Sequence, residues 1–212
     1  MGIYIEALIL YVVLFFSGST GLFPGGKPGF SDETELVRLI TYTIPSIALI
    51  WYMLLRVRKL RDWGIKPGKN DLISCLITFP CLLITGFAIA VIASNISGNS
   101  ALISLRFPST TQGWIILCFS CVISAYLEES FFRFYLLSRR DEMHMSPAGA
   151  FVLSVALFSI CHIYEGPWGF LNSVLAGMIL AFIFLRYNSL HGIAVAHGIY
   201  NIAVYAIYAL FN

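Results

Sequence analysis

Residues 125–133 read Ala125-Tyr126-Leu127-Glu128-Glu129-Ser130-Phe131-Phe132-Arg133, and they lie inside a long apolar run. Two adjacent carboxylates and an arginine in such a run need a physical reason. An ionised side chain at the centre of a bilayer costs roughly 2.5–3.5 kcal/mol on insertion scales. Either the charges neutralise one another, or they carry out chemistry in a cavity. The rest of the chain helps to decide between these interpretations.

The composition is that of an integral membrane protein. The chain has 212 residues, of which 58% are hydrophobic and 11% charged, and its mean hydropathy is +0.83. A soluble domain is about 25% charged. We therefore expect residues 1–212 to form a single all-α integral membrane domain with lipid as its main solvent. The net charge of +2 is too small to favour a nucleic-acid partner.

Seven apolar runs are candidates for membrane spans, because a spanning helix needs about 20 apolar residues. We expect a polytopic bundle of about seven transmembrane helices, with Pro45 bending the second. The runs cover residues 3–17, 36–55, 72–94, 113–138, 148–164, 168–187 and 190–211.

The lysines and arginines between the runs predict the orientation. Nine lie in the loops around residues 56–69, 139–140 and 186. Three, Lys27, Arg38 and Arg106, are counted in loops on the other side. Cytoplasmic loops carry the excess of positive charge, which places the N-terminus in the cytoplasm. The short chain shows no targeting extension, so we expect a multi-pass protein of a bacterial cytoplasmic membrane.

The charges of the opening stretch divide into two groups. Glu129 and Arg133 are four residues apart on a helix, so they share a face and can pair. Glu128 is rotated by about 100° from Glu129, so Arg133 cannot easily serve both. Its neighbours one turn away are Ser124, Ala125, Phe131 and Phe132, none of which is charged. A carboxylate left over in this way is a suitable proton acceptor near neutral pH.

Other helices bring polar groups that could meet Glu128. The fifth run contains Phe158 and His162 in an F-x-x-x-H pattern, and the seventh carries His197 and Asn201 four residues apart. A lone histidine such as His162 is more often a structural hydrogen-bond partner. Polar residues at membrane depth, however, generally face the interior of a bundle, so we expect Glu128, His162 and His197 to line one cavity. For straight helices their depths do not coincide, and a tilt, a deep turn between the fourth and fifth helices, or a short fifth helix is needed.

This set of residues suits two kinds of chemistry. A glutamate beside a histidine can take a proton from water, and a histidine with an asparagine amide can donate to an oxyanion. The set therefore predicts hydrolysis. Glu128, His162 and His197 could instead hold zinc as two histidines and a carboxylate.

The three motifs together resemble those of the CPBP family of CAAX proteases and bacteriocin-processing enzymes, also called the Abi family. Residues 128–133 look like its E-E-x-x-x-R motif, residues 158–162 like F-x-x-x-H and residues 197–201 like H-x-x-x-N. They occur in the family's order, on the fourth, fifth and seventh helices. The resemblance covers residues 113–212 as a catalytic core, with residues 1–112 as variable N-terminal helices. One departure is Phe134, where many members have glycine.

The resemblance implies an intramembrane endopeptidase that cleaves a membrane-embedded or lipidated peptide or protein. Glu128 would activate water with assistance from His162, and His197 and Asn201 would form the oxyanion site. Supporting roles would fall to Glu129 and Arg133, and to Phe158 of the second motif. The resemblance favours a mechanism without a cofactor, with zinc as the alternative.

Two other functions remain open at this point. The same bundle could be a non-catalytic scaffold or bacteriocin-immunity factor, in which the polar cluster is structural. A proton-coupled transporter also uses glutamate and histidine relays. Against the transporter, the chain shows no internal repeat and no matching pair of broken helices. The sequence predicts membrane lipid and a peptide or protein substrate as partners, and it leaves the oligomeric state open.

Overall fold

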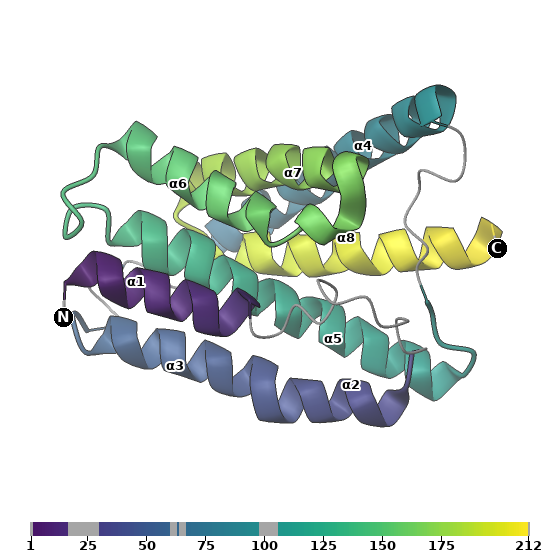
Figure 1. The fold of residues 1–212 in the computed structure, drawn as a ribbon, viewed down its shortest axis with the longest axis horizontal. Helices are drawn as coiled ribbons and strands as arrows, with labels where there is room; N and C mark the ends of the chain where they lie inside the picture. The colour runs from purple at the N-terminus through teal and green to yellow at the C-terminus, as the bar shows by residue number, and fades with distance from the viewer. Residues whose placement is uncertain (1, 17–29, 60–62, 64–66, 98–105, 212) are drawn as a thin grey trace.

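The computed structural model describes residues 2–16, 30–59, 63, 67–97 and 106–211 (Figure 1). Within these ranges the chain forms helices and no strands, which confirms the predicted all-α polytopic bundle. The elements are α1 (Ile3–Tyr11), η1 (Val12–Phe16), α2 (Asp32–Arg38), η3 (Leu39–Thr43), α3 (Ile44–Leu55), α4 (Lys69–Ser97), α5 (Thr111–Glu129), η6 (Ser130–Leu137), α6 (Pro147–Ile160), η7 (Ile163–Glu165), α7 (Gly166–Tyr187) and α8 (Leu190–Phe211).

Each of the seven predicted apolar runs corresponds to a helix, but the helices differ in length. In the described part of the chain, five are long and apolar enough to cross a membrane, at 32–55, 69–97, 111–137, 163–187 and 190–210. The helices over 3–15 and 147–160 are shorter. With its 14 residues, α6 is about 21 Å long, against a hydrocarbon core of about 30 Å.

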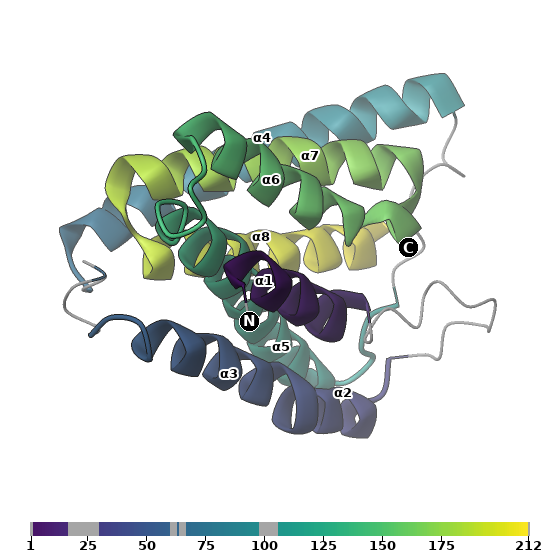
Figure 2. The same cartoon turned by 60° about the vertical axis from the view of Figure 1, so that its left-hand side comes forward.

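The α5–η6 helix is at the centre of the bundle. In both views α5 lies between α2–α3 on one side and α4, α6 and α7 on the other, while α8 packs along α5 and α4 (Figures 1 and 2). In the apolar 18-residue stretch of this helix, 56% of the residues are buried, compared with 17% in the corresponding stretch of α4. All eight side chains of η6 are buried. The motif of residues 128–133 therefore occupies the best-shielded part of the described structure.

In the described part of the chain, three segments are π-helices rather than α-helices: η1, η3 and η6. Pro45 directly follows η3, at the start of α3. Proline has no backbone N–H for the carbonyl of the preceding turn, which explains why the regular hydrogen-bond ladder changes there. The π-segment η6 contains Arg133 and begins directly after Glu129. Such segments are uncommon and occur frequently at functional sites.

The second motif lies at a helix end, which corrects the prediction that the fifth helix runs to residue 164. Helix α6 ends at Ile160, and His162 precedes the short 3₁₀ turn η7. The chain then reverses at Gly166, whose φ of 80° and ψ of −178° suit glycine, and Pro167 begins α7. A short fifth helix is one of the three arrangements that would bring His162 to the depth of the other motif residues.

Candidate active site

The predicted pair of Glu129 and Arg133 is present and fully buried. Arg133 Nε lies 3.1 Å from Glu129 Oε2, and both side chains have 0% exposure. Arg133 Nη2 also donates to the carbonyl of Gly177 on α7, at 3.4 Å. The pair thus neutralises two charges and ties η6 to a neighbouring helix.

Phe158 supports this pair from α6. The Arg133 guanidinium lies 4.5 Å from the centroid of the Phe158 ring, a cation–π distance. A Cβ atom at Gly177 would lie 3.1 Å from the Phe158 ring, so the glycine leaves space for the aromatic side chain. The phenylalanine of the F-x-x-x-H motif therefore contacts the arginine of the first motif.

His197 joins the cluster from α8, at a point where two helices approach closely. The neighbouring Gly198 faces Val122 on α5, and a Cβ atom there would lie 2.7 Å from the Val122 Cα. Small residues permit such approaches between membrane helices. The His197 Nδ1–H donates to Glu129 Oε1 at 3.0 Å, and the ring is buried. Because Nδ1 is held by Glu129, Nε2 is the nitrogen directed to other partners.

The Nε2 atom of His197 faces Glu128. It lies 3.8 Å from Glu128 Oε2, which is too long for a hydrogen bond. This oxygen is buried and has no hydrogen-bond partner among the described residues, although the side chain as a whole is 21% exposed. Glu128 is thus the one carboxylate of the motif that is not engaged by an arginine, and it has limited access from outside the bundle.

His162 and Asn201 lie beside this centre. The His162 Nδ1–H donates to the carbonyl of Phe158 at 2.8 Å, which leaves Nε2 free for another partner. The Phe158 ring centroid is 4.7 Å from that of His162 and 6.0 Å from that of His197. Both histidine rings therefore lie beside the ring of Phe158. Asn201 is half-buried one turn after His197, and its amide forms no hydrogen bond with another described side chain.

The geometry differs from the sequence analysis in which histidine is nearest to Glu128. His197 comes within 4 Å of both glutamates, whereas His162 has no ring nitrogen within that distance of a carboxylate in the described part of the chain. Asn172 of α7 is another polar residue within a membrane-spanning helix. Its amide donates to the hydroxyl of Tyr200.

Sequence analysis missed a second polar cluster that leads to Glu128. Arg38 was counted among the loop cations, but it lies inside the continuous helix 32–55 and pairs with Glu35 at 2.5 Å. Its Nη2 also donates to Ser120 Oγ at 2.6 Å and Ser124 Oγ at 3.2 Å. Ser120, Ser124 and Glu128 are spaced by four residues and share one face of α5. That spacing was the available signal for this cluster.

Phe134, where many family members have glycine, is fully buried. Its ring meets Trp51 and Trp63 edge-on, with centroids 5.1 and 5.5 Å away. The larger side chain is therefore accommodated by two tryptophans and does not enter the polar cluster.

The described residues do not assemble a metal-binding group. No three His, Cys, Asp or Glu side chains in this part of the chain come together in a way that could hold an ion. His197 holds Nδ1 against Glu129, which leaves Nε2 available, but His162 has no ring nitrogen within 4 Å of a carboxylate among the described residues.

The comparisons with known proteins agree with the three motifs. Residues 110–203 match the family described as type II CAAX prenyl endopeptidase Rce1-like. This part of the chain is thus similar to that family. The match extends from the start of α5 through most of α8 and includes every motif residue. Comparisons with curated proteins and with solved structures gave no match.

Proposed function

We propose that the chain is an intramembrane endopeptidase that cleaves a peptide bond in a membrane-embedded or lipidated peptide or protein, with Glu128 as the base that activates water. One observation carries the proposal: Glu128 Oε2 is buried, lacks a hydrogen-bond partner among the described residues and lies 3.8 Å from His197 Nε2. A buried carboxylate oxygen without a partner costs free energy, so its retention needs a function.

The proposed reaction begins when Glu128 removes a proton from water. The resulting hydroxide attacks the peptide carbonyl, and the negative charge moves to the carbonyl oxygen. His197 and Asn201 would donate hydrogen bonds to this oxyanion, while His162 Nε2 would help to position the water. Glu128 then gives its proton to the departing amine, so it is regenerated as a carboxylate.

The Glu129–Arg133 pair has a positioning role in this scheme. Glu129 accepts from His197 Nδ1 and fixes the direction of the ring, and Arg133 holds Glu129 in place. For His197 to donate from both nitrogens it must be an imidazolium, a form that the two adjacent carboxylates stabilise. The two neighbouring glutamates thus have different tasks: one supports the histidine and the other faces the reacting water.

The test is a comparison of Glu128→Gln with the wild type. The purified protein is reconstituted in vesicles and assayed on a panel of peptides that carry an apolar or prenyl anchor. We expect glutamine to reduce cleavage by about 10²–10⁴-fold, because general-base catalysis contributes that much. Glu33→Gln on α2, at an exposed carboxylate, is the matched control and should retain full activity. Normal cleavage by a folded Glu128→Gln variant would contradict the mechanism.

We also propose that the N-terminus lies on the cytoplasmic side of the membrane, on the basis of the lysine and arginine distribution. The turn after α3, the residues after η6 and the end of α7 would then face the cytoplasm. A cysteine introduced at exposed His144 should be labelled by a membrane-impermeant reagent only after the cytoplasmic face is opened. Labelling of intact cells would reverse the orientation.

A further inference from the structure

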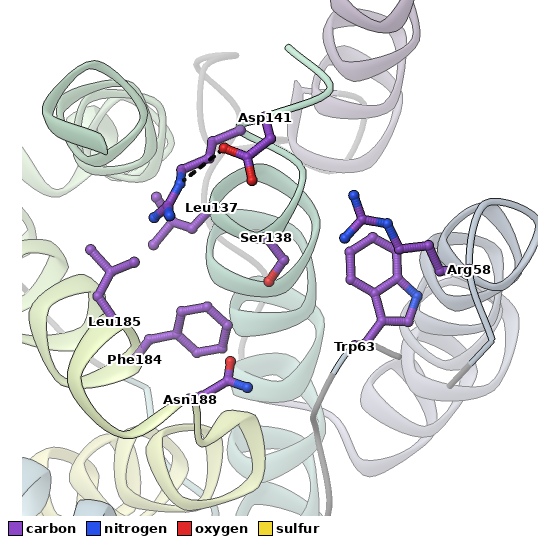
Figure 3. Close-up of a pocket in the computed structure, with 9 residues that line it drawn as sticks. Arg58, Trp63, Leu137, Ser138, Asp141, Phe184, Leu185 and Asn188 are labelled. Carbon is purple, nitrogen blue, oxygen red and sulfur yellow. Dashed lines mark ion pairs between the residues drawn. The ribbon is translucent and has the colours of Figure 1, made fainter. Parts of the chain in front are cut away.

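A cavity of about 260 Å³ lies at the end of η6, away from the motif residues. Figure 3 shows side chains from three parts of the chain facing this space: the turn after α3, the end of η6 and the end of α7. Its lining comprises Arg58, Trp63, Leu137, Ser138, Arg140, Asp141, Phe184, Leu185 and Asn188. None of these residues belongs to the proposed catalytic cluster, so the cavity needs its own explanation.

Two arginines, Arg58 and Arg140, line the cavity and provide positive charge. Arg58 extends over the ring of Trp63, with its guanidinium carbon 4.9 Å from the ring centroid (Figure 3). Its partner is Glu142, at 3.1 Å, and its side chain remains 40% exposed. Arg140 pairs with Asp141 at 3.5 Å. Asp141 is 77% exposed, and a pair of this kind is weak, so Arg140 can readily exchange it for another anion.

The remaining lining is divided into polar and apolar parts. Ser138 and Asn188 add a hydroxyl and an amide that can donate hydrogen bonds, and Asn188 is exposed. Leu137, Phe184 and Leu185 form an apolar wall, and Leu185 is 41% exposed. A ligand that suits this lining has an anionic polar group joined to apolar chains.

The position of the cavity agrees with such a ligand. Helix α3 ends at Leu55, η6 ends at Leu137 and α7 ends at Tyr187, so three helices terminate around it. Helix ends in a membrane bundle lie near the headgroup region. The volume is below the roughly 300–1,000 Å³ that encloses a drug-sized ligand, and it suits one small group of a larger molecule.

We propose that this cavity binds a phosphate group, held by the guanidinium groups of Arg58 and Arg140, and that in the membrane the phosphate belongs to the headgroup of an anionic phospholipid. Arginine binds phosphate oxygens in a bidentate manner. Basic pockets between membrane helices are suited to anionic headgroups. The acyl chains would leave along Leu185 into the bilayer. This site is independent of the catalytic cluster, and its occupancy would stabilise the contact of η6 with α7.

A purely structural role for the arginines gives a different expectation. Helix C-termini attract cations, and three helices end here. If this attraction were the whole reason for Arg58 and Arg140, then removing them would lower stability to the same extent with and without anionic lipid. A phosphate site instead predicts that the effect depends on the lipid.

The experiment measures the thermal midpoint of the detergent-purified full chain with phosphatidylglycerol, with phosphatidylcholine and with inorganic phosphate. We expect phosphatidylglycerol to raise the midpoint by a few degrees and phosphatidylcholine to leave it unchanged. The Arg58→Gln/Arg140→Gln variant should lose this rise, whereas Arg106→Gln, at an exposed arginine away from the cavity, should retain it. A similar rise with inorganic phosphate alone would support the site and identify free phosphate as a sufficient ligand.

A second variant keeps the test decisive if the double variant fails to fold. Asn188→Asp introduces a negative charge at an exposed position of the cavity, and aspartate tolerates the left-handed backbone found there, with φ of 48°. We expect it to remove most of the rise caused by phosphatidylglycerol. An equal rise with phosphatidylcholine, or a full rise in either cavity variant, would overturn the proposal.

Discussion

Two of the ionic clusters along the α5–η6 helix differ in how completely their polar atoms are satisfied. The cluster in the middle of the bundle consists of Glu128, Glu129, Arg133 and His197, and we refer to it as the central cluster. The cluster at the end of η6 consists of Glu6, Tyr135, Arg139, Glu142 and Arg58, and we refer to it as the end cluster. Among the described residues, Glu128 Oε2 and Arg133 Nη1 of the central cluster are buried without a hydrogen-bond partner. The one such atom of the end cluster, Glu142 Oε1, lies 3.1 Å from Arg58 in an ion pair.

The difference shows which cluster is built for stability. In the end cluster, Arg139 lies 2.7 Å from Glu6 and 2.8 Å from Glu142, and Tyr135 donates to Glu6 at 2.5 Å. These contacts join the N-terminal helix to the segment after η6. The central cluster is more deeply buried but leaves Glu128 Oε2 without a partner. A fold selected for stability alone would not retain that oxygen, because an unsatisfied buried polar group is costly.

The largest predicted effect is on the central pair. Glu129→Gln leaves the Arg133 guanidinium buried without a countercharge, and we expect a loss of about 3–5 kcal/mol in the free energy of unfolding. Thermal or denaturant unfolding in detergent measures this loss. The double variant Glu129→Leu/Arg133→Leu should recover much of the stability, because it buries no charge. An unaffected single variant would show that Arg133 has another anionic partner.

A smaller loss is expected where the central cluster rests on an aromatic ring. Phe158→Leu removes the cation–π contact with Arg133 and the ring shared by His162 and His197. We expect a loss of about 2 kcal/mol in stability. Peptide cleavage should fall as well, since the two histidines lose their common support. The control is Phe182→Leu on α7, which is 65% exposed and should change neither quantity. Equal effects of the two variants would contradict the role of the ring.

Much of the central cluster was accessible from the sequence because it depends on helical spacing. A distance of four residues predicted the pairing of Glu129 with Arg133, and adjacency predicted that Glu128 would be left over. The apolar runs likewise predicted the main helices of the described bundle. These inferences rest on the period of the helix, which the sequence displays directly.

The contacts between helices were less predictable. His162 was predicted to lie inside a helix, but the chain turns at residues 161–166. Gly166 is the one residue of this turn whose type signals it in the sequence. The start of the helix 32–55 was misjudged, because Arg38 was counted with the cations of the preceding loop. Asp32–Arg38 is helical, with Ser31 as its N-cap, and it carries Arg38 to the serines of α5. The spacing of apolar and polar residues in the sequence did not predict that η6 is a π-helix rather than an α-helix.

The Arg38 cluster offers an intermediate test, because it borders the central cluster without contacting its histidine. Arg38→Gln removes the ion pair with Glu35 and a positive charge near Glu128. We expect peptide cleavage to fall about tenfold, which corresponds to about 1.4 kcal/mol in the activation barrier. A shift of the pH–rate profile should accompany the fall, whereas a purely structural effect would lower the rate equally at every pH. Arg38→Lys retains the charge and should restore most of the activity.

The smallest effect is expected in the end cluster. Glu142→Gln removes two ion pairs, to Arg139 and Arg58, from a side chain that is 22% exposed. Arg139 keeps Glu6 as a partner, so no buried charge is left alone, and the loss in stability should be about 1 kcal/mol or less. It should shrink further at high salt, because partly exposed charges are screened. Catalysis should be unchanged. A salt-independent loss in stability as large as that of Glu129→Gln would contradict this expectation. The stability of both clusters would then depend on burial rather than on the number of ion-pair partners.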